Sequence, residues 1–154
     1  MSELPPSAKP QGVWGDAVLA ATVFTVGPVG VGGVALRAMP GPARTLWLDL
    51  VRELLPATAS LRRISLHVSD GRLLGGLDLT ATLRAGRPVA ERGILAAADG
   101  GEVVLFMAER LEPSTAVRVA ATLDGGEVVL ERDGLALRTP ARIGVVALDE
   151  GIAE

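Results

Sequence analysis

Hydrophobic residues occur in two kinds of run along this chain. The first kind is short, continuous and rich in valine, isoleucine and leucine, which is typical of parallel strands buried on both faces. Such runs predict strands at Val34–Leu36, Val103–Phe106 and Ile143–Leu148. Apolar and polar residues alternate at Arg63–Val68, which predicts a fourth strand.

The second kind of run has apolar residues at helical spacing. It predicts helices over Trp14–Thr25, over Arg44–Leu55 and from Pro113 to Gly125, where proline suits a first helical position and glycine an end. Short helices are also predicted at Leu77–Ala85 and Val89–Ala98. The predicted buried faces are Trp47, Leu50, Val51 and Leu54 in the second helix, and Ala116, Val119, Ala120 and Leu123 in the helix after Pro113.

Because strands alternate with helices, the chain is expected to form an α/β domain with three layers and a mainly parallel sheet. One hairpin is expected beside it, since Glu127–Arg132 and Leu135–Arg138 flank Asp133-Gly134, a pair typical of a two-residue type I′ turn. Residues 1–12 are polar and contain prolines, which predicts a flexible lead before a folded domain over 13–154.

Composition narrows the functional classes. The chain has 154 residues, 49% of them hydrophobic, a net charge of -3 and no cysteine. These values fit one globular domain in a reducing cytoplasm, and they argue against zinc–thiolate sites and against a nucleic-acid partner. The single histidine, His67, is expected to be structural. The uncharged run Ala17–Leu36 has the length of a membrane span, but five glycines and prolines interrupt it, so no span is expected.

The loop after the first strand carries the main candidate chemistry. Residues 38 to 45 read Ala-Met-Pro-Gly-Pro-Ala-Arg-Thr, where a phosphate-binding loop reads Gly-x-x-x-x-Gly-Lys-Ser/Thr. A phosphate-binding loop cradles phosphate with backbone N–H groups, but the prolines in the loop of this chain have no N–H group to offer. The sequence therefore predicts a degenerate nucleotide site with weak or lost binding and no catalytic residue. Its candidate residues are Ala38, Gly41, Ala43, Arg44 and Thr45.

Several longer motifs resemble one family. The runs Leu74–Leu79, Glu91–Leu95, Gly125–Gly134 and Pro140–Arg142 are similar to the AAA+ domains of magnesium chelatase, and the resemblance extends back to Trp14. That complex inserts Mg²⁺ into protoporphyrin IX in chlorophyll and bacteriochlorophyll biosynthesis. The resemblance implies an AAA+-type fold in which the hairpin and the segment around Leu74–Leu95 are additions that face neighbouring subunits.

The resemblance also favours one type of subunit. When the chain is aligned with the ATP-hydrolysing I subunit, the Lys-Ser of that subunit falls on Arg44-Thr45, and its Asp-Glu pair at the end of the third strand falls on Phe106-Met107. A degenerate loop and a degenerate second motif are similar to the D subunit. Compared with the family, the chain is expected to stop before the fifth strand and the helical lid, which would leave Val34–Leu36 at an open sheet edge.

The resemblance implies a non-catalytic platform that assembles with the I subunit and, through the complex, with the porphyrin-binding H subunit. An oligomer is expected, in a complex that uses ATP and Mg²⁺, while this chain is expected to hold no cofactor or metal. Two alternatives stay open: a divergent, weak ATPase using Arg44 and Thr45, and a free-standing AAA+-like interaction module. The candidate interface residues, which could equally form a solvated hairpin tip, are Glu131, Arg132, Asp133 and Arg138.

Overall fold

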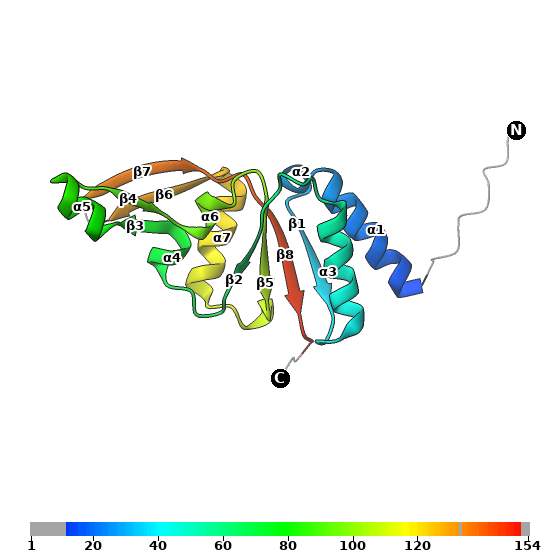
Figure 1. Ribbon diagram of the computed structural model, residues 1–154. Helices are drawn as coiled ribbons and strands as arrows, with labels where there is room; N and C mark the ends of the chain where they lie inside the picture. The colour runs from blue at the N-terminus through cyan, green and yellow to red at the C-terminus, as the bar shows by residue number, and fades with distance from the viewer. Residues whose placement is uncertain (1–11, 133, 152–154) are drawn as a thin grey trace, which may run out of the picture.

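The computed structural model describes residues 12–132 and 134–151. Its centre is a four-stranded parallel sheet with the strand order β1-β8-β5-β2 (Figure 1). The strands are β1 (Gly33–Arg37), β2 (Leu61–Ile64), β5 (Glu102–Phe106) and β8 (Gly144–Asp149). The last strand in the sequence thus lies inside the sheet, between β1 and β5, and the predicted parallel sheet is confirmed.

Helices α1 (Gly12–Val26) and α3 (Pro42–Leu54) cover one face of the sheet, with the short α2 (Pro28–Val31) at its end (Figure 1). Trp47 is 1% exposed, and its Nε1–H donates to the Ala17 carbonyl oxygen at 2.7 Å. This indole joins the two helices because it packs in one cluster with Phe24 and with Val104 and Leu148 of the sheet. The predicted core position of Trp47 is confirmed.

The other face of the sheet is covered by α4 (Asp70–Leu74), α6 (Ile94–Ala97) and α7 (Pro113–Gly125). Val103 and Leu105 of β5 pack in this second cluster, whereas Val104 between them packs in the first. Burial on both faces explains why the strand reads as a continuous apolar run. The three-layer α/β architecture is therefore as predicted.

An insertion between β2 and β5 differs from the prediction. Strands β3 (Gly75–Leu77) and β4 (Ala90–Arg92) pair antiparallel, with α5 (Leu79–Ala85) between them. For the helices predicted at 77–85 and 89–98, the predicted first residues are therefore wrong. The cause is a close approach of two backbones: a β-carbon at Gly75, whose φ is +100°, would lie 2.4 Å from the Glu91 carbonyl oxygen. Glycine permits this contact, which apolar periodicity does not reveal.

The second addition is the predicted hairpin, which is confirmed. Strands β6 (Glu127–Arg132) and β7 (Leu135–Pro140) pair antiparallel, and Arg132 lies opposite Leu135, so two residues connect them. Asp133 lies outside the described residues. Gly134 has a φ of +75°, which glycine adopts without strain. Val128 and Leu130 bury one side of β6 against the domain.

One strand boundary and the phases of two helices also need correction. The fourth strand was predicted at Arg63–Val68, but β2 ends at Ile64 because the Val68 N–H turns back to the Ser65 carbonyl oxygen at 3.2 Å. In α3, Leu54 is 42% exposed and Leu48 is buried in its place. In α7 the predicted Ala116 and Ala120 are exposed, whereas Thr115, Val119 and Thr122 are buried.

One of the two buried threonines in α7, Thr122, shows why apolarity alone gives the wrong helix phase. The Thr122 hydroxyl donates to the Arg118 carbonyl oxygen at 2.9 Å, so its polar group is satisfied inside the helix itself. A threonine paired in this way can face the core as a small apolar side chain would.

The uncharged run at 17–36 is divided among α1, α2 and β1. Among the described residues, the structure contains no helix with the length and apolar character needed to cross a membrane.

Candidate nucleotide site

The degenerate loop lies at the carboxyl edge of the sheet, between β1 and α3. The Ala38 N–H donates to the Asp149 carbonyl oxygen at 2.8 Å, and Gly41 precedes the first residue of α3. The helix begins at Pro42, two residues before its predicted start at Arg44, so Ala43 and Arg44 already belong to its first turn. Since Pro42 has no N–H, the helix end offers fewer donors to an anion than a glycine-rich loop would.

Arg44, which the family resemblance aligns with the phosphate-binding lysine, is neutralised by an internal carboxylate. Its Nη1 lies 2.9 Å from Oε1 of Glu150, and each of the two side chains is 12% exposed. The same Nη1 lies 3.5 Å from the Ala38 carbonyl oxygen. Glu150 thus supplies the negative charge that a nucleotide phosphate would otherwise bring.

Further carboxylates surround this pair. Asp149 bonds Arg37 at 2.8 Å and accepts the Gly151 N–H at 2.7 Å. The Gly151 N–H and then Arg37 lower the pKa of Asp149, which keeps that carboxyl ionised at neutral pH. The Glu150 N–H also lies 3.3 Å from Oε2 of Glu109. This edge therefore holds three carboxylates, which disfavour an incoming phosphate.

Thr45 does not point toward a shared ligand position. Its side chain is exposed, and its hydroxyl donates back to the Gly41 carbonyl oxygen at 3.2 Å. Its hydroxyl proton is therefore used by the start of the helix.

The second degenerate motif ends β5. The Phe106 ring centroid lies 4.2 Å from the guanidinium group of Arg63 and 5.8 Å from that of Arg44. Such geometry allows cation–π attraction, but Phe106 itself supplies no carboxylate to the loop. Met107 follows with a φ of +53°, a backbone conformation uncommon outside glycine, and leads into the 3₁₀ turn η1 (Ala108–Arg110).

Sequence reasoning did not identify Glu150 as part of this site. A signal was present, because the acidic pair Asp149-Glu150 directly follows an apolar strand. Parallel strands deliver the residues after them to one edge of the sheet, and β8 lies next to β1. Only that strand order places Glu150 beside Arg44.

The hairpin residues that were predicted to form an interface, as far as the structure describes them, do not point the same way. Glu131 is exposed on β6, and Arg138 forms an ion pair with Glu127 across the hairpin. Arg132 turns back toward the domain, since its Nη2 lies 3.6 Å from where a β-carbon on Gly76 would be. The fourth candidate, Asp133, lies outside the described residues.

Comparisons with known proteins agree with this fold, although no family model matches the chain. The 60 kDa magnesium-chelatase subunit of Rhodobacter capsulatus is 42% identical over 106 residues, which are 68% of this chain and 18% of that protein. Its counterpart in Cereibacter sphaeroides is 36% identical over 143 residues, 92% of this chain and 22% of that protein. The chain thus spans about a fifth of the length of these relatives.

The 38 kDa (I) magnesium-chelatase subunit of Rhodobacter capsulatus is 32% identical over 108 residues, which are 70% of this chain and 30% of that protein. A solved structure of the complex between the BchI and BchD subunits of magnesium chelatase contains a similar chain, with a TM-score of 0.66 and 25% identity over 86% of this chain and 51% of that one.

The sheet order, the loop before α3 and these likenesses define an AAA+-like domain. More specifically, the chain belongs to the magnesium-chelatase family and corresponds to part of its 60 kDa (D) subunits.

Proposed function

We propose that this chain is a non-catalytic, AAA+-like platform of magnesium chelatase. In the cytoplasm it assembles with the ATP-hydrolysing I subunit, and the resulting complex drives Mg²⁺ insertion into protoporphyrin IX. The chain reaches the porphyrin-binding H subunit only through that complex. The likeness to D subunits and to a chain of the BchI–BchD complex supports this role. The observation that carries the non-catalytic part is the ion pair between Arg44 and Glu150.

The pair explains why the loop would bind phosphate poorly. A nucleotide would have to displace the Glu150 carboxylate from Arg44, and both side chains are only 12% exposed. Breaking such a pair leaves a partly buried carboxylate without its partner, which costs free energy. Hydrolysis also needs charge and positioning around the γ-phosphate, and Phe106 and Met107 stand where the family resemblance puts an acidic pair. This chain accordingly holds no cofactor or metal of its own, and the divergent-ATPase alternative is disfavoured.

ATP is expected to bind this chain no more tightly than about millimolar, which corresponds to roughly −4 kcal/mol. The reason is the neutralised Arg44 together with the missing N–H donors at Pro40 and Pro42. Isothermal titration calorimetry with ATP and Mg²⁺ measures this affinity, and a micromolar dissociation constant would overturn the proposed role of the loop. The variant Glu150→Gln serves as the matched test of cause: it frees Arg44 and removes one negative charge, so ATP should bind it more tightly than it binds the parent.

The exposed side of the hairpin is the proposed contact with the I subunit. Glu131 is exposed, so Glu131→Lys should change the free energy of unfolding by no more than about 0.5 kcal/mol. Charges at the rim of an interface act mainly on the association rate and its salt dependence. The variant should therefore associate more slowly with the I subunit, as measured by surface plasmon resonance at two salt concentrations.

The matched control is Glu53→Lys, which makes the same charge change at an exposed position of α3 on the opposite side of the sheet. The control should associate as the parent does. Equal association rates for the parent and Glu131→Lys would remove the hairpin from the interface.

A further inference from the structure

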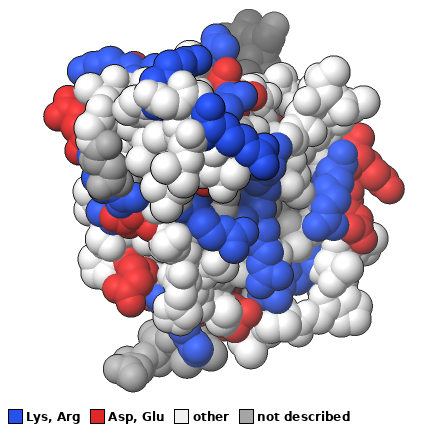
Figure 2. Space-filling model, turned by 60° about the vertical axis from the view of Figure 1, so that its left-hand side comes forward, with Lys and Arg blue, Asp and Glu red and all other residues white. Residues whose placement is uncertain are grey.

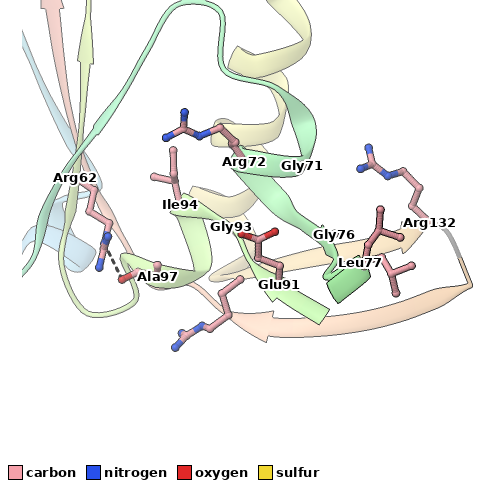
Figure 3. A pocket seen from close by; sticks show the side chains of 12 residues that line it. Arg62, Gly71, Arg72, Gly76, Leu77, Glu91, Gly93, Ile94, Ala97 and Arg132 are labelled. Atoms are coloured by element: carbon pink, nitrogen blue, oxygen red, sulfur yellow. Dashed lines mark hydrogen bonds between the residues drawn. The ribbon is translucent and has the colours of Figure 1, made fainter. Parts of the chain in front are cut away.

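A pocket with a volume of about 640 Å³ lies away from the degenerate loop, among β2, the β3–β4 insertion and the end of β6 (Figure 3). Its charged lining consists of Arg62, Arg72, Arg92, Arg132 and Glu91. Even without Arg132, three arginines against one glutamate make this region positive, although the chain as a whole has a net charge of -3. Figure 2 shows Lys and Arg side chains gathered over the middle of one face, with several of the acidic side chains nearer its margins.

Backbone carbonyl groups, rather than carboxylates, hold two of these arginines. Arg62 donates from Nε to the Ala97 carbonyl oxygen at 3.0 Å, and Arg92 donates from Nη2 to that of Ala96 at 2.7 Å. Arg72 is exposed on α4. Within the described part of the chain, Arg62, Arg72 and Arg92 form no ion pair with a carboxylate. The positive charges of Arg62 and Arg72 are therefore not neutralised within that part of the chain, and Arg92 acts only through space on the Asp99 carboxylate, whose pKa it helps to lower after the stronger effect of Arg142.

The arrangement of the pocket indicates what kind of ligand fits. All the arginines come from separate elements, and those labelled in Figure 3, Arg62, Arg72 and Arg132, stand around the pocket instead of converging on one point. A single phosphate could not reach them all, whereas carboxylates spaced along a chain could pair with them one by one. The guanidinium fork matches carboxylate geometry. Apolar side chains also line the pocket, namely Leu77, Ile94 and Leu79, and the last is 67% exposed.

We propose that this pocket binds an acidic peptide segment of a protein partner, whose carboxylates pair with Arg62, Arg72 and Arg92 while its apolar side chains pack on Leu79 and Ile94. Nucleic acid fits less well, because a phosphate backbone needs a continuous basic track and Glu91 stands among these arginines. This inference goes beyond the proposed function, which names a partner subunit but no segment of it and no pocket.

The test uses fluorescence anisotropy with a labelled eight-residue peptide in which glutamate alternates with leucine or alanine. The parent chain should bind this peptide at low salt and release it as salt is added, because the attraction is screened. A matched peptide with glutamine in place of glutamate should bind at least roughly tenfold more weakly. The double variant Arg62→Gln/Arg72→Gln should lose roughly tenfold in affinity for the acidic peptide, with thermal melts confirming that it is folded.

The control variant Arg52→Gln/Arg110→Gln removes two charges outside the pocket and should bind as the parent does. The proposal is overturned if the two peptides bind equally, if the pocket variant keeps its affinity, or if a single-stranded oligonucleotide binds and the acidic peptide does not. No chelatase subunit is present in this assay, so its failure leaves the proposed assembly with the I subunit untouched.

Discussion

Replacing Trp47 with alanine should lower the free energy of unfolding by about 3–5 kcal/mol. The indole is 1% exposed and fills the space between α1, α3 and the sheet, and its Nε1–H bond to the Ala17 carbonyl oxygen ties the two helices together. Alanine would leave a cavity there and remove that bond. Chemical denaturation followed by circular dichroism measures the change.

Leu46→Ala is the matched control for this variant, since Leu46 is the neighbouring residue of α3 but is 59% exposed. Its effect should be several times smaller. If Trp47→Ala melts within a few degrees of the parent, the indole does not join the two helices in the way described.

Glu102→Gln should remove most of a pH dependence of stability between about pH 4.5 and 7. Glu102 begins β5 with 1% exposure, and its Oε2 has no hydrogen-bond partner among the described residues. Burial raises the pKa of this carboxyl from 4.5 to about 7. The folded chain therefore keeps a proton that the unfolded chain releases, and the contribution of Glu102 to stability is highest below pH 4.5 and falls as pH rises to about 7. The loss is on the order of 3 kcal/mol.

Urea unfolding of the parent and of Glu102→Gln at pH 5 and pH 8 measures this effect. The carboxyls of Asp99 and Asp149 do not interfere with this measurement. The Arg142 N–H and then other contacts lower the pKa of Asp99, and the Gly151 N–H and then other contacts lower that of Asp149, so both titrate below this pH window. Glu53→Gln, at an exposed position, should keep the parent's pH dependence. Parallel profiles for the parent and Glu102→Gln would show that the buried carboxyl is not the cause.

The sheet could be predicted from the sequence because its strands are buried on both faces. Residues such as Val103, Val104 and Leu105 face alternate clusters, so the run contains no polar position to obscure it. The insertion could not be predicted in the same way. Strands β3 and β4 have three residues each, too few for a period, and their pairing depends on the contact of Gly75 with the backbone at Glu91.

The candidate site, too, could be predicted from the sequence only in part. The candidate loop residue Arg44 could be proposed from the sequence, since an arginine there is a local departure from the spacing of a phosphate-binding loop. Its partner Glu150 lies 106 positions away, and their contact follows from the pairing of β8 with β1. Likewise, Arg132 could be placed on a hairpin, but its return toward Gly71 and Gly76 depends on how the hairpin packs on the insertion.

Sedimentation velocity of this chain mixed with the I subunit of magnesium chelatase, in the presence of ATP and Mg²⁺, tests the central claim most directly. A platform that assembles with the ATP-hydrolysing subunit should leave its own slow boundary, expected for 15.8 kDa, and move with the heavier species. If the chain sediments at its own rate at every concentration of the I subunit, the proposed role as an assembly platform is contradicted.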